Sequence, residues 1–110
     1  MSVCHCLACQ KRTGSAFGAQ ARYGRDQVRT ECGSPATHVR TADSGNRVTF
    51  YFCRDCGSTL FWELEAMPGA VAVALGAFDD PTFLAPRISI YEARKHGWLR
   101  IDGDELEHLD

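Results

Sequence analysis

Two short cysteine clusters constrain this chain more than any other feature of its sequence. The first is Cys4-x-Cys6-x-x-Cys9 and the second is Cys53-x-x-Cys56, so five of the six cysteines in 110 residues are clustered. Alternate residues of an extended segment point the same way, so Cys4 and Cys6 can face a common metal ion. The turn that follows can bring Cys9 back toward the same ion. This spacing predicts metal binding, and Zn²⁺ is the ion that best matches thiolates in a tetrahedral site.

Other uses of these thiols stay open at this point. An iron–sulfur cluster takes the same ligands, and the Cys53/Cys56 pair has the spacing of a thiol oxidoreductase. The oxidoreductase alternative lacks the strand-to-helix context that such motifs need. Gly57 is instead typical of a zinc knuckle, in which the backbone turns back and donates amide hydrogens to the sulfurs. Cys32 stands alone at the end of an expected strand, and we expect it to be a buried structural thiol.

Length and composition predict one globular domain over residues 1–110. The hydrophobic fraction is 45% and the charged fraction 24%, and no apolar run approaches the roughly 20 residues that span a bilayer. No basic segment followed by an apolar stretch opens the chain, so we expect a cytoplasmic protein in which cysteines stay reduced. The arginines are scattered and the net charge is −2, which predicts no nucleic-acid or membrane partner. Nothing here predicts the oligomeric state.

Short β-forming runs separated by turn residues predict a mainly β fold. One helix is expected from about residue 7 to 13, ending at Gly14, because glycine accepts the left-handed conformation that terminates many helices. His5 lies between two candidate ligands and should point away from them if the segment is extended; a place facing the same cleft and a packing or orienting role both stay open. His38, His96 and His108 are expected to be surface or hydrogen-bonded residues. The expected strands are 17–23, 27–32, 36–40, 47–53, 59–65, 70–75 and 87–93.

The stretch from Cys4 to Phe17, CHCLACQKRTGSAF, resembles the C-H-C-x-x-C-x-x-x-x-G-[ST]-x-F pattern of the glutathione-dependent formaldehyde-activating enzyme (Gfa) family, which also contains centromere protein V. The resemblance continues through YFCRDCGSTLF and GAFDDP and ends near Trp98. It implies an Mss4-like zinc-binding β fold. It also implies the joining of glutathione, or a related small thiol, to formaldehyde or another small electrophile, formally a carbon–sulfur lyase activity.

The resemblance also implies roles for individual residues. Cys4, Cys6 and Cys9 would hold a zinc ion with an exchangeable position and would be the catalytic cysteines. Cys53 and Cys56 match half of a second, structural zinc site, so one or two zinc ions per chain are expected. We expect the substrate to be bound beside the first cluster, with two basic residues pairing with the carboxylates of glutathione; the predicted substrate-binding residues are Lys11, Arg12, Gly14, Ser15 and Phe17.

The sequence departs from the family pattern in two places. Members usually carry a C-x-C pair on a strand ahead of the first cluster, whereas three residues precede Cys4 here. The Cys53/Cys56 site is therefore expected to be completed by an upstream segment, by zinc sharing among all five clustered thiolates, or by another chain or water. Ser89 stands where the family often has a histidine. The alternative function is accordingly a non-catalytic, zinc-stabilised binding module.

Overall fold

The computed structural model describes residues 1–110 and divides into two compact units. One unit comprises Met1–Gln20 and Phe78–Asp110, and the other comprises Ala21–Ala77. Strands predominate and there is a single α-helix, so the mainly β class is confirmed, and the architecture is consistent with an Mss4-like fold. None of the helices has the length and apolar character that a bilayer span requires. The assignment of residues 1–110 to one domain stays a prediction.

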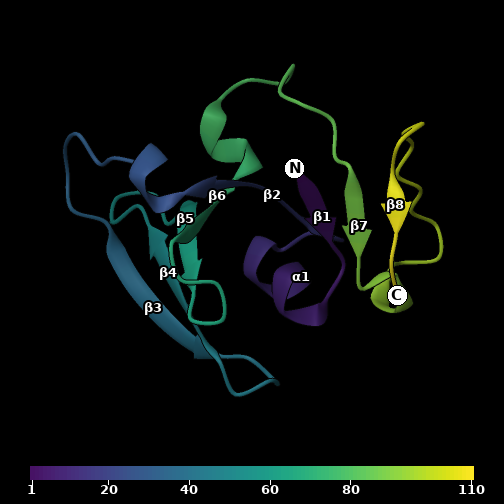
Figure 1. The fold of residues 1–110 in the computed structure, drawn as a ribbon, viewed down its shortest axis with the longest axis horizontal. Helices are drawn as coiled ribbons and strands as arrows, with labels where there is room; N and C mark the ends of the chain where they lie inside the picture. The colour runs from purple at the N-terminus through teal and green to yellow at the C-terminus, as the bar shows by residue number, and fades with distance from the viewer. The chain divides into compact units, whose positions relative to one another are not determined.

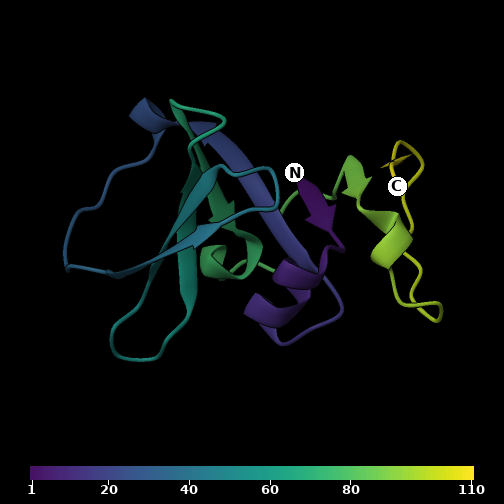
Figure 2. The same ribbon diagram turned by 90° about the horizontal axis from the view of Figure 1, so that it is seen from below.

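The first unit is built around β1 (Ser2–Cys4), which lies between two partner strands (Figure 1). It pairs antiparallel with the start of β2 (Gly18–Gly24) and parallel with β7 (Ile88–Ile90). A further parallel pairing joins β7 to β8 (Glu107–His108). In a view turned by 90°, β1 is again seen to lead directly into α1 (Leu7–Thr13) (Figure 2). The first cysteine cluster therefore lies where a strand held on both edges gives way to a helix.

The α1 helix has the bounds that the sequence predicts, and side-chain chemistry explains both ends. Cys6 is its N-cap, and its sulfur accepts a hydrogen bond from the backbone N–H of Cys9 at 3.3 Å. Gly14 closes the helix with a φ of 63°, and its N–H donates to the carbonyl of Gln10. Gly14 is needed because an L side chain is disfavoured in this left-handed conformation.

The second unit contains an antiparallel meander of four strands, β3 (Ala36–Thr41), β4 (Arg47–Phe52), β5 (Thr59–Leu64) and β6 (Ala70–Ala74). The end of β2 that belongs to this unit lies beside β6. Val48, Trp62 and Ala72 form the core, and Phe50 packs on Trp62 with ring centroids 5.7 Å apart. Val48 and Phe50 are alternate residues of β4, so both lie on the face of the strand that packs on this core.

Two expected strands are wrong in whole or in part. Residues 27–32 form no strand: a 3₁₀ helix, Arg25–Gln27, is followed by irregular chain up to β3. This segment has no partner strand and is largely exposed, and Cys32 is exposed with it. The expectation of a buried Cys32 is therefore wrong, because it depended on a strand with an inward face.

The last expected strand, 87–93, is shorter than predicted. After β7, Tyr91 adopts the left-handed region at a φ of 57°, and a 3₁₀ helix, Glu92–Arg94, follows. This turn places Glu92 near β8, where its backbone N–H donates to the carbonyl of Leu109 at 3.0 Å. Glu92 is thereby directed back over β7, which matters for the site described next.

Candidate metal centre

The three cysteines of the first cluster converge. Cys4 ends β1, Cys6 caps α1 and Cys9 lies in the first turn of the helix, and their sulfur atoms all lie within 4.8 Å of one another. A tetrahedral site with Zn–S bonds of about 2.3 Å places its sulfurs about 3.8 Å apart. The three sulfurs thus need only a small contraction to hold such an ion, and they fit a thiolate-binding metal.

The surroundings of the cluster favour ionisation of one thiol. The pKa of Cys9 is lowered to about 6, mainly because the Cys4 thiol donates a hydrogen bond to its sulfur, with further contributions from Cys6 and Arg12. The pKa of Cys4 is raised, because it keeps the proton it shares with Cys9 and because it is buried. Cys9 is thus the thiol of the cluster that most readily becomes a thiolate, the form in which a cysteine binds a metal or acts as a nucleophile.

The predicted substrate-binding residues lie along α1 and just beyond it. Lys11, Gly14 and Ser15 are exposed, whereas Arg12 and Phe17 are partly buried. Arg12 is hydrogen-bonded to Cys9, and the Phe17 ring lies 6.0 Å from the His5 ring, measured between centroids. The structure thus brings Arg12 to the cysteine cluster and Phe17 to His5. The role of these five residues in binding substrate stays a prediction.

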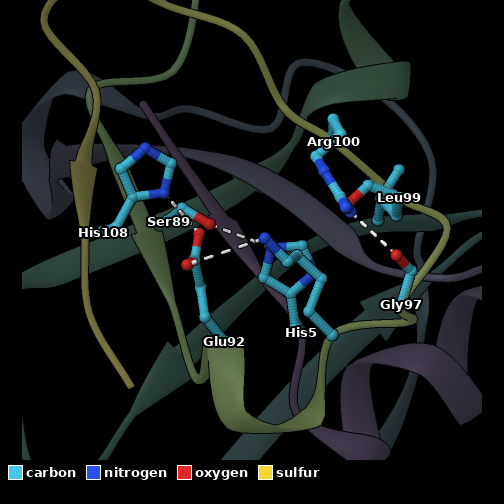
Figure 3. A network of polar contacts seen from close by, with 8 residues as sticks. His5, Ser89, Glu92, Gly97, Leu99, Arg100 and His108 are labelled. Atoms are coloured by element: carbon cyan, nitrogen blue, oxygen red, sulfur yellow. Dashed lines mark hydrogen bonds and ion pairs between the residues drawn. The ribbon is translucent and has the colours of Figure 1, made fainter.

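The His5 side chain belongs to a polar network with Ser89, Glu92 and His108 (Figure 3). It is completely buried, and its Nε2 lies 2.9 Å from the hydroxyl of Ser89, which is also completely buried. Ser89 is in turn hydrogen-bonded to Glu92. One Glu92 oxygen lies 2.6 Å from Nδ1 of His108, and the other lies 3.7 Å from the Lys95 ammonium. Of the alternatives left open for His5, this placement agrees with a packing or orienting role.

The chemistry of the network fixes the direction of its hydrogen bonds. Hydrogen bonds from Ser89 and His108 lower the pKa of Glu92, so its carboxylate is ionised and accepts only. The Ser89 hydroxyl must therefore donate to Glu92, and its oxygen accepts from His5 Nε2–H. Burial lowers the pKa of His5, which keeps the ring neutral and leaves Nδ1 without a proton. The network thus sets the His5 tautomer and holds the segment between Cys4 and Cys6 on β7.

Hydrogen bonds of the Gln10 side chain hold α1 in place. The Gln10 side-chain amide donates to the carbonyls of His5, at 2.8 Å, and Arg94, at 3.0 Å. Its carbonyl oxygen lies 2.9 Å from Nε2 of His96. The helix carrying Cys9 is therefore tied to the turn that follows β7.

The second cysteine pair lies in the other unit and forms a tight turn. The backbone N–H of Cys53 donates to the Ser58 carbonyl, and the N–H of Gly57, at a φ of 78°, donates to the Cys53 carbonyl, both at 2.9 Å. The chain thus turns back at Gly57, as the sequence predicts. Hydrogen bonds with Ser58 lower the pKa of the exposed Cys56. Metal binding by Cys53 and Cys56 stays a prediction.

Comparison with known proteins adds the family. A family model described as glutathione-dependent formaldehyde-activating enzyme matches residues 1–94. The chain belongs to this family. The match spans both cysteine clusters as well as Ser89 and Glu92, and it stops before His108. Gfa family membership, together with the converging cysteines, supports a role connected with glutathione and formaldehyde and a possible zinc site.

Several residues that shape this Gfa-family site gave no signal in the sequence. In the sequence Ser89 is only a departure from the family pattern, and no motif relates Glu92 or His108 to His5. The partners Ser89 and His5 are 84 residues apart, so no local spacing relates them. The only hint in the sequence is the position of His5 between Cys4 and Cys6, which predicts that its side chain points away from theirs.

Proposed function

We propose that this chain holds a zinc ion through Cys4, Cys6 and Cys9 and joins glutathione to formaldehyde, as an S-(hydroxymethyl)glutathione synthase of the carbon–sulfur lyase class. The observation that supports this most directly is the convergence of the three sulfurs within 4.8 Å in a chain of the Gfa family. A metal bound by these thiolates would lower the pKa of a thiol and polarise a carbonyl group. Cys4, Cys6 and Cys9 would then be the catalytic ligands.

The reaction balances without an oxidant or reductant. The thiol sulfur attacks the carbonyl carbon, a carbon–sulfur bond forms, the carbonyl π bond breaks, and the oxygen receives the proton that the thiol loses. The chain must therefore bind an anionic tripeptide and keep its thiol beside the cysteine cluster. Lys11 is exposed at the end of α1, where its ammonium can pair with a glutathione carboxylate. Gly14, Ser15 and Phe17 follow Lys11 in the sequence and are proposed to bind the substrate with it.

The same thiol and aldehyde chemistry would serve other small electrophiles, so formaldehyde is the first substrate to try. We further propose that Cys53 and Cys56 contribute to a structural zinc site, giving up to two zinc ions per chain. All six cysteines are free thiols in the structure, which suits a reducing cytoplasm. Glutathione and a small aldehyde are the proposed partners, with no nucleic acid or membrane among them.

The test compares Cys6→Ser with Cys32→Ser, because Cys6 lies in the cluster and Cys32 is an exposed cysteine outside both clusters. Zinc per chain is measured by atomic emission, and the rate of glutathione–formaldehyde adduct formation is measured by exchange NMR. We expect Cys6→Ser to lose about one zinc and the rate enhancement, and Cys32→Ser to keep both. Retained zinc and retained rate in Cys6→Ser would refute the proposal. Zinc bound without any rate enhancement in the unmodified chain would favour the binding module.

A further inference from the structure

The Arg12 side chain lies beside the cysteine cluster. Its Nη2 atom is buried, and a hydrogen bond joins its side chain to Cys9. Both groups lie over Gly18 at the start of β2: a Cβ added to Gly18 would lie 2.9 Å from Arg12 Nη2, 3.4 Å from Cys9 Cβ and 3.7 Å from Cys9 Sγ. The guanidinium and the Cys9 sulfur therefore share one small space that the absence of a side chain at residue 18 leaves open.

The position of Arg12 on the helix explains how it reaches this space. It follows Cys9 by three residues, so the two side chains lie on the same face of α1. An arginine at a helix C-terminus also interacts favourably with the helix dipole, but that interaction needs no contact with a sulfur and no buried nitrogen. Lys11 meets the dipole requirement equally well while remaining exposed. The burial of Arg12 Nη2 against Cys9 and Gly18 thus calls for a separate explanation.

We propose that Arg12 is a positioning residue of the metal centre, which balances the charge of its thiolates and favours the binding of a further anionic thiol. Three thiolates around a divalent ion carry one net negative charge, and a substrate thiolate as fourth ligand adds another. The Arg12 cation, which does not lose its proton at ordinary pH, offsets one of these charges at the sulfur of Cys9. This inference rests on the proposed function, since it assumes a metal at the cluster.

The expected magnitude follows from other metal sites. Loss of a group that hydrogen-bonds a metal ligand typically lowers metal affinity about 10- to 100-fold. Arg12→Met, which keeps an unbranched apolar stem and removes the charge, should therefore weaken Zn²⁺ binding by at least about tenfold. Gly18→Ala should act similarly with the arginine still present, because its Cβ would displace the guanidinium from Cys9. Arg29→Met is the control, since it removes the same charge from an exposed position outside the proposed site.

The experiment measures Zn²⁺ affinity by competition with a chromophoric chelator, and the ligand set by the absorption spectrum of the Co²⁺-loaded protein with and without glutathione. The unmodified chain and Arg29→Met should bind Zn²⁺ within about threefold of each other and show the same change in the sulfur-to-cobalt band on adding glutathione. Arg12→Met should bind Zn²⁺ more weakly and need at least about tenfold more glutathione for that change. A purely structural arginine would lower thermal stability but leave both readouts in place.

The outcomes separate this inference from the proposed function. If Arg12→Met and Gly18→Ala match Arg29→Met in both readouts, the Arg12 assignment is wrong while the zinc proposal stands. If the unmodified chain binds no Zn²⁺ through Cys4, Cys6 and Cys9, the proposed function itself is wrong. Far-UV circular dichroism checks that each variant is folded. Should Arg12→Met not fold, Gly18→Ala alone carries the comparison, because it keeps every residue of α1.

Discussion

Removal of the Ser89 hydroxyl should destabilise the chain strongly for so small a change. Ser89 is completely buried, and its oxygen joins His5, also completely buried, to Glu92. In Ser89→Ala the neutral His5 ring would keep a buried Nε2–H without an acceptor, which costs about 1–3 kcal/mol. Glu92 would lose less, because it keeps His108 and Lys95. We expect a loss of about 2 kcal/mol in the free energy of unfolding.

The assay is urea unfolding followed by circular dichroism, with excess zinc for every variant because a bound metal raises apparent stability. A loss of about 2 kcal/mol corresponds to a fall in melting temperature of about 8 °C for a chain of this size. Ser34→Ala is the control, since Ser34 is exposed and only its backbone carbonyl accepts a hydrogen bond, from Arg54. It should change the unfolding free energy by less than about 0.5 kcal/mol. Equal stabilities for the two variants would refute the buried-network argument.

Three further predictions concern single residues. Hydrogen bonding lowers the pKa of Glu92 below its usual value of 4.5, so its contribution to stability is present above that pH and lost as the pH falls below it. Urea midpoints measured against pH should therefore decline less steeply between about pH 5 and 3 in Glu92→Gln, and an unchanged slope would contradict this. Gly14→Ala should lower the free energy of unfolding by about 1 kcal/mol through backbone strain alone, because no atom lies within 4 Å of the added Cβ. Gly14→Asn should lower it by less, both measured by urea unfolding. Trp62→Ala should lose about 3–5 kcal/mol and Trp62→Phe clearly less, by urea unfolding.

Local sequence patterns predicted those parts of the fold in which neighbouring residues make the decisive contacts. The α1 helix was predicted with its observed bounds because Gly14 supplies its own stop signal. Short β-forming runs bounded by turn residues predicted β3, β4 and β5. Residues 27–32 were predicted as a strand from the same kind of pattern. That prediction was wrong because a strand needs a partner, and partners are chosen by the rest of the chain.

The same distinction between local and tertiary contacts holds for the candidate site. The spacing of Cys4, Cys6 and Cys9 by itself determined that three sulfurs could meet, because an extended pair followed by a helical turn is a local geometry. Only the tertiary structure decided what surrounds them: Ser89 beside His5, and Gly18 leaving room for Arg12 beside Cys9. These contacts join residues far apart in the sequence or depend on where a strand packs. Their physical basis is burial, which makes each polar group require a partner that no local spacing specifies.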